Sequence, residues 1–369
     1  MNIQLDAPNV GQLEKEAIAR CIDSTFISTF GPFVDDFEER FARYVDAPAA
    51  VAVQSGTAAL HIALAELGLK PGDEVIVPAL TFVASVNPVL YAGASPVLVD
   101  VEPDTWLLDI RKVRDAITPR TKAIIPVHIY GNPCDMDALL EICDQHSIAI
   151  VEDATESLGG TWRGKPTGTL GEFGCFSFNG NKLITTGGGG MVIARDAERA
   201  KRVKFLVNQA RDASKGYYHP ELGYNYRMTN LEASLGLAQM ERIDEFLQKK
   251  RTFARIYKEA LDGLPSVALQ KETPGAENAW WLPSIIVENI PVPELQEALR
   301  ERGVPTRRIF SPLHTYPYLR QHALFPCPNA ERIYEQGLNL PASTANDEAS
   351  VQRAAEIVRE ILLEKGGQA

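Results

Sequence analysis

The sequence predicts an α/β protein with a mostly parallel sheet flanked by helices, followed by a smaller α+β region. Three observations support this prediction. Short apolar runs alternate with helical patterns from about residue 50 to residue 210, segment 229–264 is then apolar at helical spacing, and a strand with further helices follows. We place the division near residue 250, with a large domain over 1–250 and a small α+β domain over 251–369.

The strands of the large domain are predicted where apolar runs end at turn residues or charges. These runs cover 49–54, 74–78, 96–101, 122–128 and 148–153, and helical patterns such as 57–69 and 135–146 lie between them. Sheets of this kind bind ligands outside the carboxyl ends of their strands. The residues that follow each strand are therefore the first candidates for a site.

The pattern changes after residue 210. Segment 229–264 predicts one long helix or two nearly continuous helices, and 280–288 predicts a strand. Segment 291–303 predicts a helix, because it has proline near its start and glycine after its end. The final helix is expected over roughly 347–364.

Composition excludes several classes of function. A formal net charge of −11 argues against general nucleic-acid binding and against binding to an anionic membrane. No apolar run approaches the length of a membrane span, and the N-terminal residues do not resemble a secretory signal. The five cysteines form no CxxC pair, which favours a reduced, cytoplasmic protein, and no spacing suggests metal ligands.

Two features at strand ends could carry chemistry. Asp153 ends a buried strand, where it either caps the following helix or points into the ligand crevice and pairs with a cation. Ser55, Gly56 and Thr57 lie where a strand turns into a helix. They form either an ordinary N-cap or a phosphate site, because the start of a helix offers free N–H groups and the positive end of its dipole.

A third feature is Lys182, the one charged residue in "FSFNGNKLITTGGGGMVIA" at 176–194. It is either a solvated loop lysine or a nucleophilic amine, since apolar surroundings disfavour the ammonium form. The four glycines after it form either a flexible turn or a bare backbone that passes close to a ligand. A phosphate site, a strand-end aspartate and a lysine together suit one cofactor, pyridoxal 5′-phosphate (PLP).

The chain resembles the PLP-dependent sugar aminotransferases of the DegT/StrS family, which have fold type I, over essentially its whole length. The resemblance is carried by these motifs, in this order: "SGTAAL", "VIVPALTFVASVNPVLYAGASPVLVDV", "VEDATES", "GCFSFNGNK", "GGGGMV", "GYNYRMTNLEAS" and "PLHTYPYL". It implies a homodimer with composite active sites, glutamate as amino donor, and a nucleotide-linked keto-sugar as acceptor.

The resemblance also implies residue roles. Lys182 would form the Schiff base with PLP, and Asp153 would pair with the pyridinium nitrogen. The remaining cofactor contacts would come from Gly56, Thr57, Ala58, Phe82, Glu156, Ser177, Asn179 and, in the neighbouring subunit, Asn225. The substrate would contact Thr29, Gly31, Gly188, Arg227, His314 and Tyr316.

The chain departs from many family members at two places, with glycine at position 188 and glutamate at position 156. These departures and "FSFNGNK" favour the branch that makes 4-amino sugars, with UDP-2-acetamido-2,6-dideoxy-4-keto-hexose as acceptor. The alternatives are a GDP-4-keto-6-deoxymannose 4-aminotransferase of the perosamine type and a 3-keto-sugar aminotransferase. A dehydratase of this fold is disfavoured because it carries histidine at the lysine position, and a non-catalytic binding protein need not keep Lys182, Asp153 and Thr57.

The sequence leaves the roles of several further residues open. Arg211, Arg227, Arg307 and Arg308 could each bind a diphosphate or the carboxylate of the donor. Trp280 and Trp281 are interpreted as packing residues. His128 either faces the crevice or lies satisfied in the core.

Overall fold

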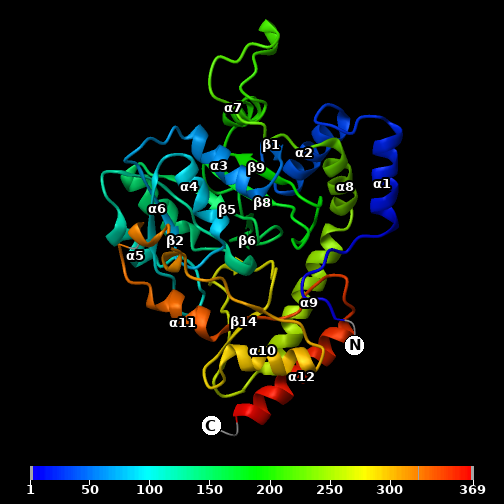
Figure 1. Cartoon of the computed structure of the whole chain (residues 1–369), viewed down its shortest axis with the longest axis vertical. Coiled ribbons are helices and arrows are strands. Elements are labelled where there is room, and N and C mark those ends of the chain that lie inside the picture. The colour runs from blue at the N-terminus through cyan, green and yellow to red at the C-terminus, as the bar shows by residue number, and fades with distance from the viewer. Residues whose placement is uncertain (1–2, 323, 367–369) are drawn as a thin grey trace.

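The computed structural model describes residues 3–322 and 324–366. A seven-stranded sheet lies at its centre, in the upper half of Figure 1, with the strand order β1-β9-β8-β5-β4-β2-β3. Its strands are β1 (Ala50–Val53), β2 (Glu74–Pro78), β3 (Ser95–Val99), β4 (Thr121–Ile124), β5 (Ala149–Asp153), β8 (Phe173–Ser177) and β9 (Gly190–Ala194). The predicted fold class is confirmed, because only β9 runs antiparallel to its neighbours β1 and β8.

Alternate residues of this sheet face two different layers, as the twofold period of a strand requires. On the first face, Val51 and Val192 pack in the core of α3 (Gly56–Glu66) and α7 (Ala197–Val207). On the other face, Ala52 and Met191 pack with aromatic residues of α2 (Pro32–Tyr44). Burial on both faces explains why the strands are almost continuously apolar.

Further helices complete the large half of the molecule. They are α1 (Gln12–Asp23), α4 (Asn87–Tyr91), α5 (Ile110–Ala116), α6 (Met136–His146) and α8 (Asn230–Met240). A short three-stranded sheet joins β6 (Thr161–Trp162), β7 (Lys165–Pro166) and β11 (Ala276–Glu277) in the order β11-β6-β7. Asp135 caps α6 by accepting a hydrogen bond from the backbone N–H of Ala138.

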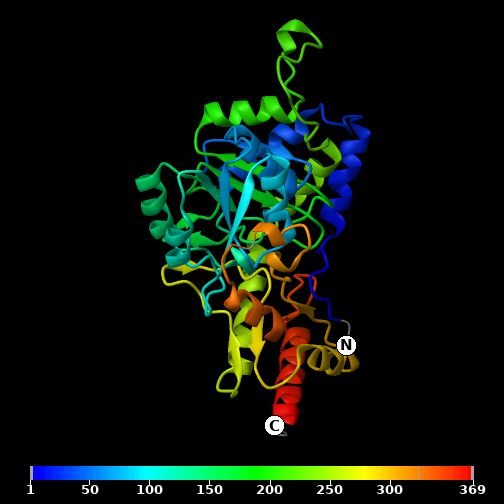
Figure 2. The same ribbon diagram turned by 60° about the vertical axis from the view of Figure 1, so that its left-hand side comes forward.

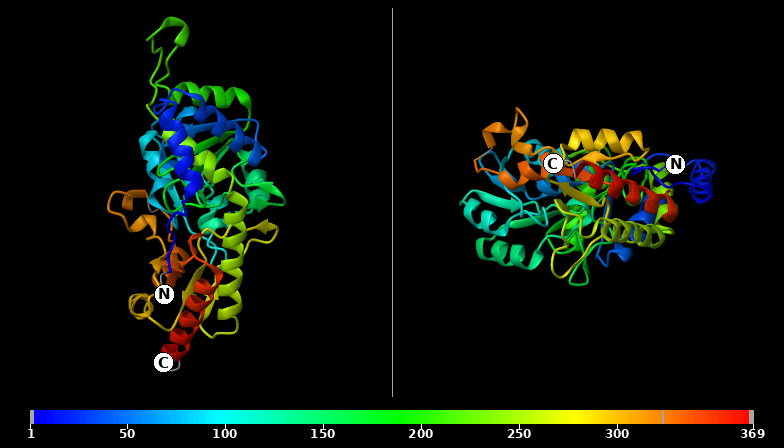
Figure 3. Two further views of the ribbon diagram at one scale, coloured as in Figure 1. Left: turned by 90° about the vertical axis from the view of Figure 1, so that its right-hand side faces the viewer. Right: turned by 90° about the horizontal axis from the view of Figure 1, so that it is seen from below.

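The C-terminal half is built on a four-stranded antiparallel sheet with the order β10-β12-β14-β13. Its strands are β10 (Val267–Leu269), β12 (Ser284–Val287), β13 (Arg307–Arg308) and β14 (Gly337–Asn339), and its helices are α10 (Val292–Glu301), α11 (Pro328–Gln336) and α12 (Glu348–Gly366). The helix expected over 229–264 is present as α8 and α9 (Ile243–Leu261). Figure 3 shows α9 and α12 side by side.

The domain boundary near residue 250 stays a prediction, and it falls within α9, which joins the two halves. The predicted domain limits also include residues 1–2, 323 and 367–369, which lie outside the described residues. In Figure 1 the N-terminal end of the described chain lies beside α12, and α12 itself forms the C-terminal end. There the N-terminal segment is held by a hydrogen bond from the N–H of Ala342 to the carbonyl of Leu5.

One segment projects beyond the body of the molecule. It follows α7, is drawn in green, and extends upward in Figures 1 and 2. Tyr217 and Leu222 in this segment are 85% and 78% exposed. Exposed large apolar residues of this kind are typical of contact surfaces.

The described helices include none that is long and apolar enough to cross a membrane. Among the same residues, no group of three or more histidine, cysteine, aspartate or glutamate side chains is arranged to hold a metal ion.

Candidate active site

The main cavity lies at the carboxyl ends of β1, β2 and β5, where the strand order predicts a ligand crevice, and it has a volume of about 460 Å³. Segments that are far apart in the sequence form its wall. The lining residues are Ser55, Gly56, Thr57, Leu60, Thr81, Phe82, Ala84, Ser85, Val127, Asp153, Thr155, Glu156, Ser177, Asn179, Asn181, Lys182, Gly188, Gly189, Trp281, Arg307 and Phe310.

Asp153 reaches the cavity from the end of β5, and its side chain is buried. Its Oδ2 accepts a hydrogen bond of 2.6 Å from the hydroxyl of Ser85, which is 2.8 Å from the hydroxyl of Thr81. Its Oδ1 accepts bonds from the N–H and the hydroxyl of Thr155, at 3.2 and 2.7 Å. Donors on both oxygens hold the carboxylate in one orientation, and a carboxylate with lone pairs to spare can accept one more N–H.

Glu152, the residue before Asp153, points away from the cavity because successive side chains of a strand alternate. Its carboxylate accepts hydrogen bonds from the backbone N–H groups of Gly168, Leu170 and Gly171 at 2.7 to 2.8 Å, and from Nε2 of His128 at 3.0 Å. The N–H of Cys134 donates to Nδ1 of His128, so the ring proton lies on Nε2. His128 is therefore a satisfied core histidine, the second of the two interpretations left open by the sequence.

The start of α3 forms the next part of the wall. Ser55 caps the helix by accepting a hydrogen bond from the N–H of Ala58, and Gly56 and Thr57 of its first turn line the cavity. A Cβ at Gly56 would lie 2.8 Å from Cβ of Ser177, so glycine lets that serine approach the helix start. Main-chain N–H groups and a hydroxyl thus converge at the positive end of a helix dipole, which suits a phosphate.

Lys182 is held between a carboxylate and an aromatic ring. Its Nζ lies 3.5 Å from Oε1 of Glu156 and 4.0 Å from the ring centre of Trp281, and its side chain is only 13% exposed. Burial raises the pKa of Glu156, although the neighbouring Lys182 and a 2.8 Å hydrogen bond from the N–H of Tyr130 act in the opposite direction. The arrangement fixes the direction in which the amine enters the cavity.

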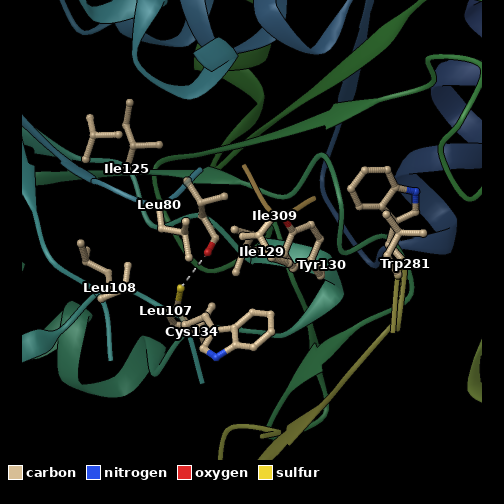
Figure 4. Packing of buried hydrophobic residues seen from close by; sticks show 14 of the residues in the cluster. Leu80, Leu107, Leu108, Ile125, Ile129, Tyr130, Cys134, Trp281 and Ile309 are labelled. Carbon is tan, nitrogen blue, oxygen red and sulfur yellow. Dashed lines mark hydrogen bonds between the residues drawn. The ribbon is translucent and has the colours of Figure 1, made fainter. Parts of the chain in front are cut away.

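Trp281 was interpreted from the sequence as a packing residue, and its position corrects that interpretation. Its ring stacks on Tyr130 with centres 6.2 Å apart, at one end of the apolar cluster of Figure 4, but the ring also covers the amine of Lys182. Its Nε1 donates to the carbonyl of Asn181 at 2.7 Å, and its own carbonyl accepts from Nζ of Lys250 at 2.8 Å. Lys250 is buried, which lowers its pKa to about 7.

The four glycines after Lys182 have different structural roles. Gly187 and Gly189 have φ values of 85° and 89°, which glycine adopts more readily than other residues. A Cβ at Gly190 would lie 2.6 Å from the backbone of Ser55. Gly188 has neither constraint, because its Cβ would meet Oε1 of Glu232 at an ordinary 3.4 Å, and this glycine lines the cavity. Three of the glycines are thus required by the backbone conformation or by close backbone packing, and the fourth, Gly188, leaves space in the cavity.

The structure brings together most of the candidate residues, but not all. Within the described chain, Thr29, Gly31 and Arg227 line a second hollow, which also contains Phe30 and Lys204. The residues that line neither hollow are Ala58, Asn225, His314 and Tyr316. Ala58 contributes its N–H to the cap of α3, His314 is 2.9 Å from Glu331, and Tyr316 stacks on Tyr318.

Sequence reasoning missed several cavity residues. Ser85 and Thr81 hold Asp153, and Asn181, Phe310 and Trp281 line the wall. Phe310 lies 5.6 Å from Phe82, whose ring is half exposed in the cavity. The signal that was available was the hydroxyl pair in "ALTFVAS", directly after a buried strand, whereas no pattern in the sequence marks Phe310 or Trp281.

The residues of the cavity fit the cofactor expected from the sequence. A helix start with a glycine cradle suits a phosphate ester, a fixed buried carboxylate suits a pyridinium nitrogen, and an amine faces the same space. The exposed ring of Phe82 offers a flat apolar surface for an aromatic ring. The chemistry of these groups therefore matches the three parts of PLP.

Comparisons with known proteins agree with this chemistry. The model of the DegT/DnrJ/EryC1/StrS aminotransferase family matches residues 8–359. A GDP-perosamine synthase of Caulobacter vibrioides is 41% identical over 370 residues, which cover 98% of this chain and 98% of that protein. A dTDP-3-amino-3,4,6-trideoxy-alpha-D-glucose transaminase of Streptomyces venezuelae is 37% identical, over 93% of this chain and 90% of that protein.

Among solved structures, the sugar aminotransferase Spr1654 of Streptococcus pneumoniae in its PMP form superposes with a TM-score of 0.93. It is 28% identical to this chain, and the match covers 98% of this chain and 100% of that one. The same protein has also been solved in a PLP form.

Proposed function

Because the chain belongs to the DegT/DnrJ/EryC1/StrS aminotransferase family, we propose that it aminates carbon 4 of a nucleotide-linked 4-keto-6-deoxy sugar, with glutamate as amino donor. PLP is its cofactor, and sugar aminotransfer is its activity. The cofactor supplies an electron sink for the carbon that loses or gains the amine. The acceptor sugar, the nucleotide and the donor belong to the proposal.

The sequence identity to the Caulobacter GDP-perosamine synthase carries the choice of acceptor. It supports GDP-4-keto-6-deoxymannose, the alternative left open by the sequence, better than the UDP-linked acetamido sugar that the sequence analysis favoured. Gly188 keeps the UDP-linked sugar as the second candidate, since this position leaves room for a substituent in the cavity. The Streptomyces relative, whose name describes a 3-amino sugar, supports amination at carbon 3 less strongly, because its identity is lower.

The residues of the cavity divide the work of the reaction. Lys182 would carry the cofactor and, when released, move a proton to or from the substrate carbon as a general base or acid. Glu156, 3.5 Å away, and the face of Trp281 would hold the released amine in place. Asp153, fixed by Ser85 and Thr155, would place a negative charge against the ring nitrogen.

Other residues would bind and orient without exchanging protons. Gly56, Thr57 and Ser177 would hold the phosphate at the start of α3, and Ala58 would support them through the helix cap. Phe82 would cover one face of the cofactor ring, and Asn179, at the end of β8, would contact phosphate or substrate.

We also propose that the active sites are shared between two subunits of a homodimer. Support comes from the candidates that lie away from the cavity, namely Asn225, Thr29, Gly31 and Arg227, and from the exposed apolar residues of the projecting segment nearby. His314 and Tyr316 would contact substrate from the segment after Phe310. Mixing Lys182→Ala with Asn225→Ala subunits should restore about a quarter to half of the sites, since one site of each hybrid dimer would be intact.

The acceptor is tested by measuring kcat/KM for both keto-sugars at saturating glutamate, with the product examined by NMR. We expect the GDP-linked sugar to be preferred and the new amine to be on carbon 4. A preference for the UDP-linked sugar would select the second candidate, and amination at carbon 3 would refute both assignments while leaving the family membership intact.

A further inference from the structure

Two cationic side chains line the main cavity within the described residues, Lys182 and Arg307. Arg307 is one of four arginines that the sequence left open as anion-binding candidates. The others point elsewhere: Arg227 lines the second hollow, and Arg308 lies 4.2 Å from the ring centre of Tyr334. Arg211 lies over Tyr217, in the projecting segment. Arg307 and Arg308 are neighbours on β13, so their side chains leave opposite faces.

Arg307 is held in place by the N-terminal segment. Its Nη1 lies 2.7 Å from Oδ2 of Asp6, and its Nη2 lies 3.1 Å from Oδ1. Asn181 also donates to Oδ2 of Asp6, at 3.1 Å. Asp6 is 11% exposed, whereas the Arg307 side chain remains 38% exposed. Asp6 occupies two of the five N–H groups of the guanidinium, so further donors are available to a ligand in the cavity.

A chain of contacts connects Arg307 with the amine of Lys182. Asn181, which binds Asp6, directly precedes Lys182, and its carbonyl accepts the indole N–H of Trp281. The same indole ring covers the amine of Lys182. The guanidinium is therefore linked to the amine through Asp6, Asn181 and this indole, and both cations line the same cavity.

We propose that Arg307 binds a carboxylate of the amino donor. This inference rests on the proposed function. In an amino acid donor the carboxylate is one bond from the carbon that reacts, so its cationic partner must lie near Lys182. The diphosphate of a nucleotide sugar is attached across the ring from carbon 4, so it lies a ring width farther from the amine. Apart from Lys182, Arg307 is the cation of the described cavity wall, and its planar fork matches a carboxylate.

Asp6 gives this site a second property. The same cavity must accept an anionic donor and then a sugar ring with neutral hydroxyl groups. While the sugar is present, Arg307 retains a carboxylate partner in Asp6, so no unpaired cation is left facing the sugar. Arg307 thus binds one substrate and keeps a paired charge while the other is present.

The test measures binding rather than turnover. Calorimetry on the PLP-loaded protein would follow glutarate, a dicarboxylate that has no amine to transfer, and GDP, which carries the diphosphate. We expect Arg307→Ala to weaken glutarate binding about 10- to 100-fold, as expected for loss of a charge-assisted bidentate contact, with GDP binding changed by less than about twofold. We expect the glutarate affinity of Arg307→Lys to lie between those of the wild type and Arg307→Ala, because lysine keeps the charge and lacks the planar fork of the guanidinium.

Arg308→Ala is the matched control, since it removes the neighbouring guanidinium, which points away from the cavity, and should leave glutarate binding unchanged. Weaker GDP binding with unchanged glutarate binding in Arg307→Ala would overturn the proposal and assign the residue to the diphosphate. Unchanged binding of both probes, or an equal loss in Arg308→Ala, would overturn it as well. Failure of the proposed acceptor would appear only in sugar turnover, so the two failures are distinguishable.

Discussion

Replacing Asp153 by asparagine should separate the charge of this residue from its place in the fold. Oδ1 accepts a hydrogen bond from the backbone N–H of Thr155, which can only donate. The amide oxygen of asparagine must therefore take the position of Oδ1. The new NH2 group then faces Ser85. The hydroxyl of Ser85 can rotate to accept from it and donate instead to Thr81, 2.8 Å away. Every hydrogen bond of the cluster is retained while the negative charge is lost.

The two consequences differ in size. Because no buried polar group loses its partner, we expect the free energy of unfolding to change by less than about 1 kcal/mol. The carboxylate that would face the ring nitrogen is lost, and with it an electrostatic interaction made in the transition state. We expect a rate loss on the order of a thousandfold, which corresponds to about 4 kcal/mol.

Asp100→Asn provides the matched control. Asp100 is also buried and directly follows a strand, but its two oxygens accept backbone N–H groups of Asn329 and Ala330. A backbone N–H cannot act as an acceptor. One of these two N–H groups would therefore face the new NH2 group and lose its hydrogen bond. We expect this variant to lose about 1 to 3 kcal/mol of stability and to keep its activity.

The assay combines guanidinium unfolding with the rate at which glutamate converts the PLP-loaded protein, followed by visible absorbance. A rate loss of tenfold or less in Asp153→Asn would refute the role of the charge. A stability loss as large as that of Asp100→Asn would refute the account of the hydroxyl pair.

Three further predictions concern Lys182, the glycines that follow it, and Lys250. Lys182→Ala should abolish turnover and still bind pyridoxamine phosphate, as measured by calorimetry; turnover near the wild-type rate would exclude its catalytic role. Gly190→Ala should lower the free energy of unfolding by about 3 kcal/mol and Gly188→Ala by less than about 0.5 kcal/mol in denaturant titrations, because only the first would push a Cβ into fixed backbone; equal losses would contradict the geometry. Lys250 has a pKa lowered to about 7, so the unfolded chain binds a proton that the folded chain lacks between pH 7 and 10. Stability should therefore rise across this window by at most about 1.4 kcal/mol per pH unit, and Lys250→Met should remove that slope in unfolding measured at several pH values.

The part of the fold and site that follows strand ends was predictable from the sequence. Parallel strands finish at one edge of a sheet, so Asp153 at the end of β5 and Gly56 after β1 had to lie near each other once the strands were recognised. Strand limits were less accurate: 122–128 was expected as one strand, but β4 ends at Ile124, two residues before Pro126. A proline lacks the N–H that a central strand needs.

The contributions of the C-terminal half were not predictable. Trp281 and Arg307 reach the cavity only because the C-terminal half shares a core with the larger half, and this placement leaves no periodic signal. Asp6 is still harder to foresee, since its partner Arg307 is 301 residues away in the sequence. The choice of Arg307 over Arg308 depends on which face of a two-residue strand meets the cavity.

The order in which the cavity wall is made during synthesis has a consequence for the cell. The strands that carry the phosphate cradle, the aspartate and the lysine are all translated once β9 has ended at residue 194, but Trp281, Arg307 and Phe310 are translated much later. A nascent chain can therefore expose the reactive amine before the wall that covers it exists. Loading of the cofactor into a closed site is thus a late event of biosynthesis, and a chain truncated before residue 310 would leave its lysine open to other aldehydes.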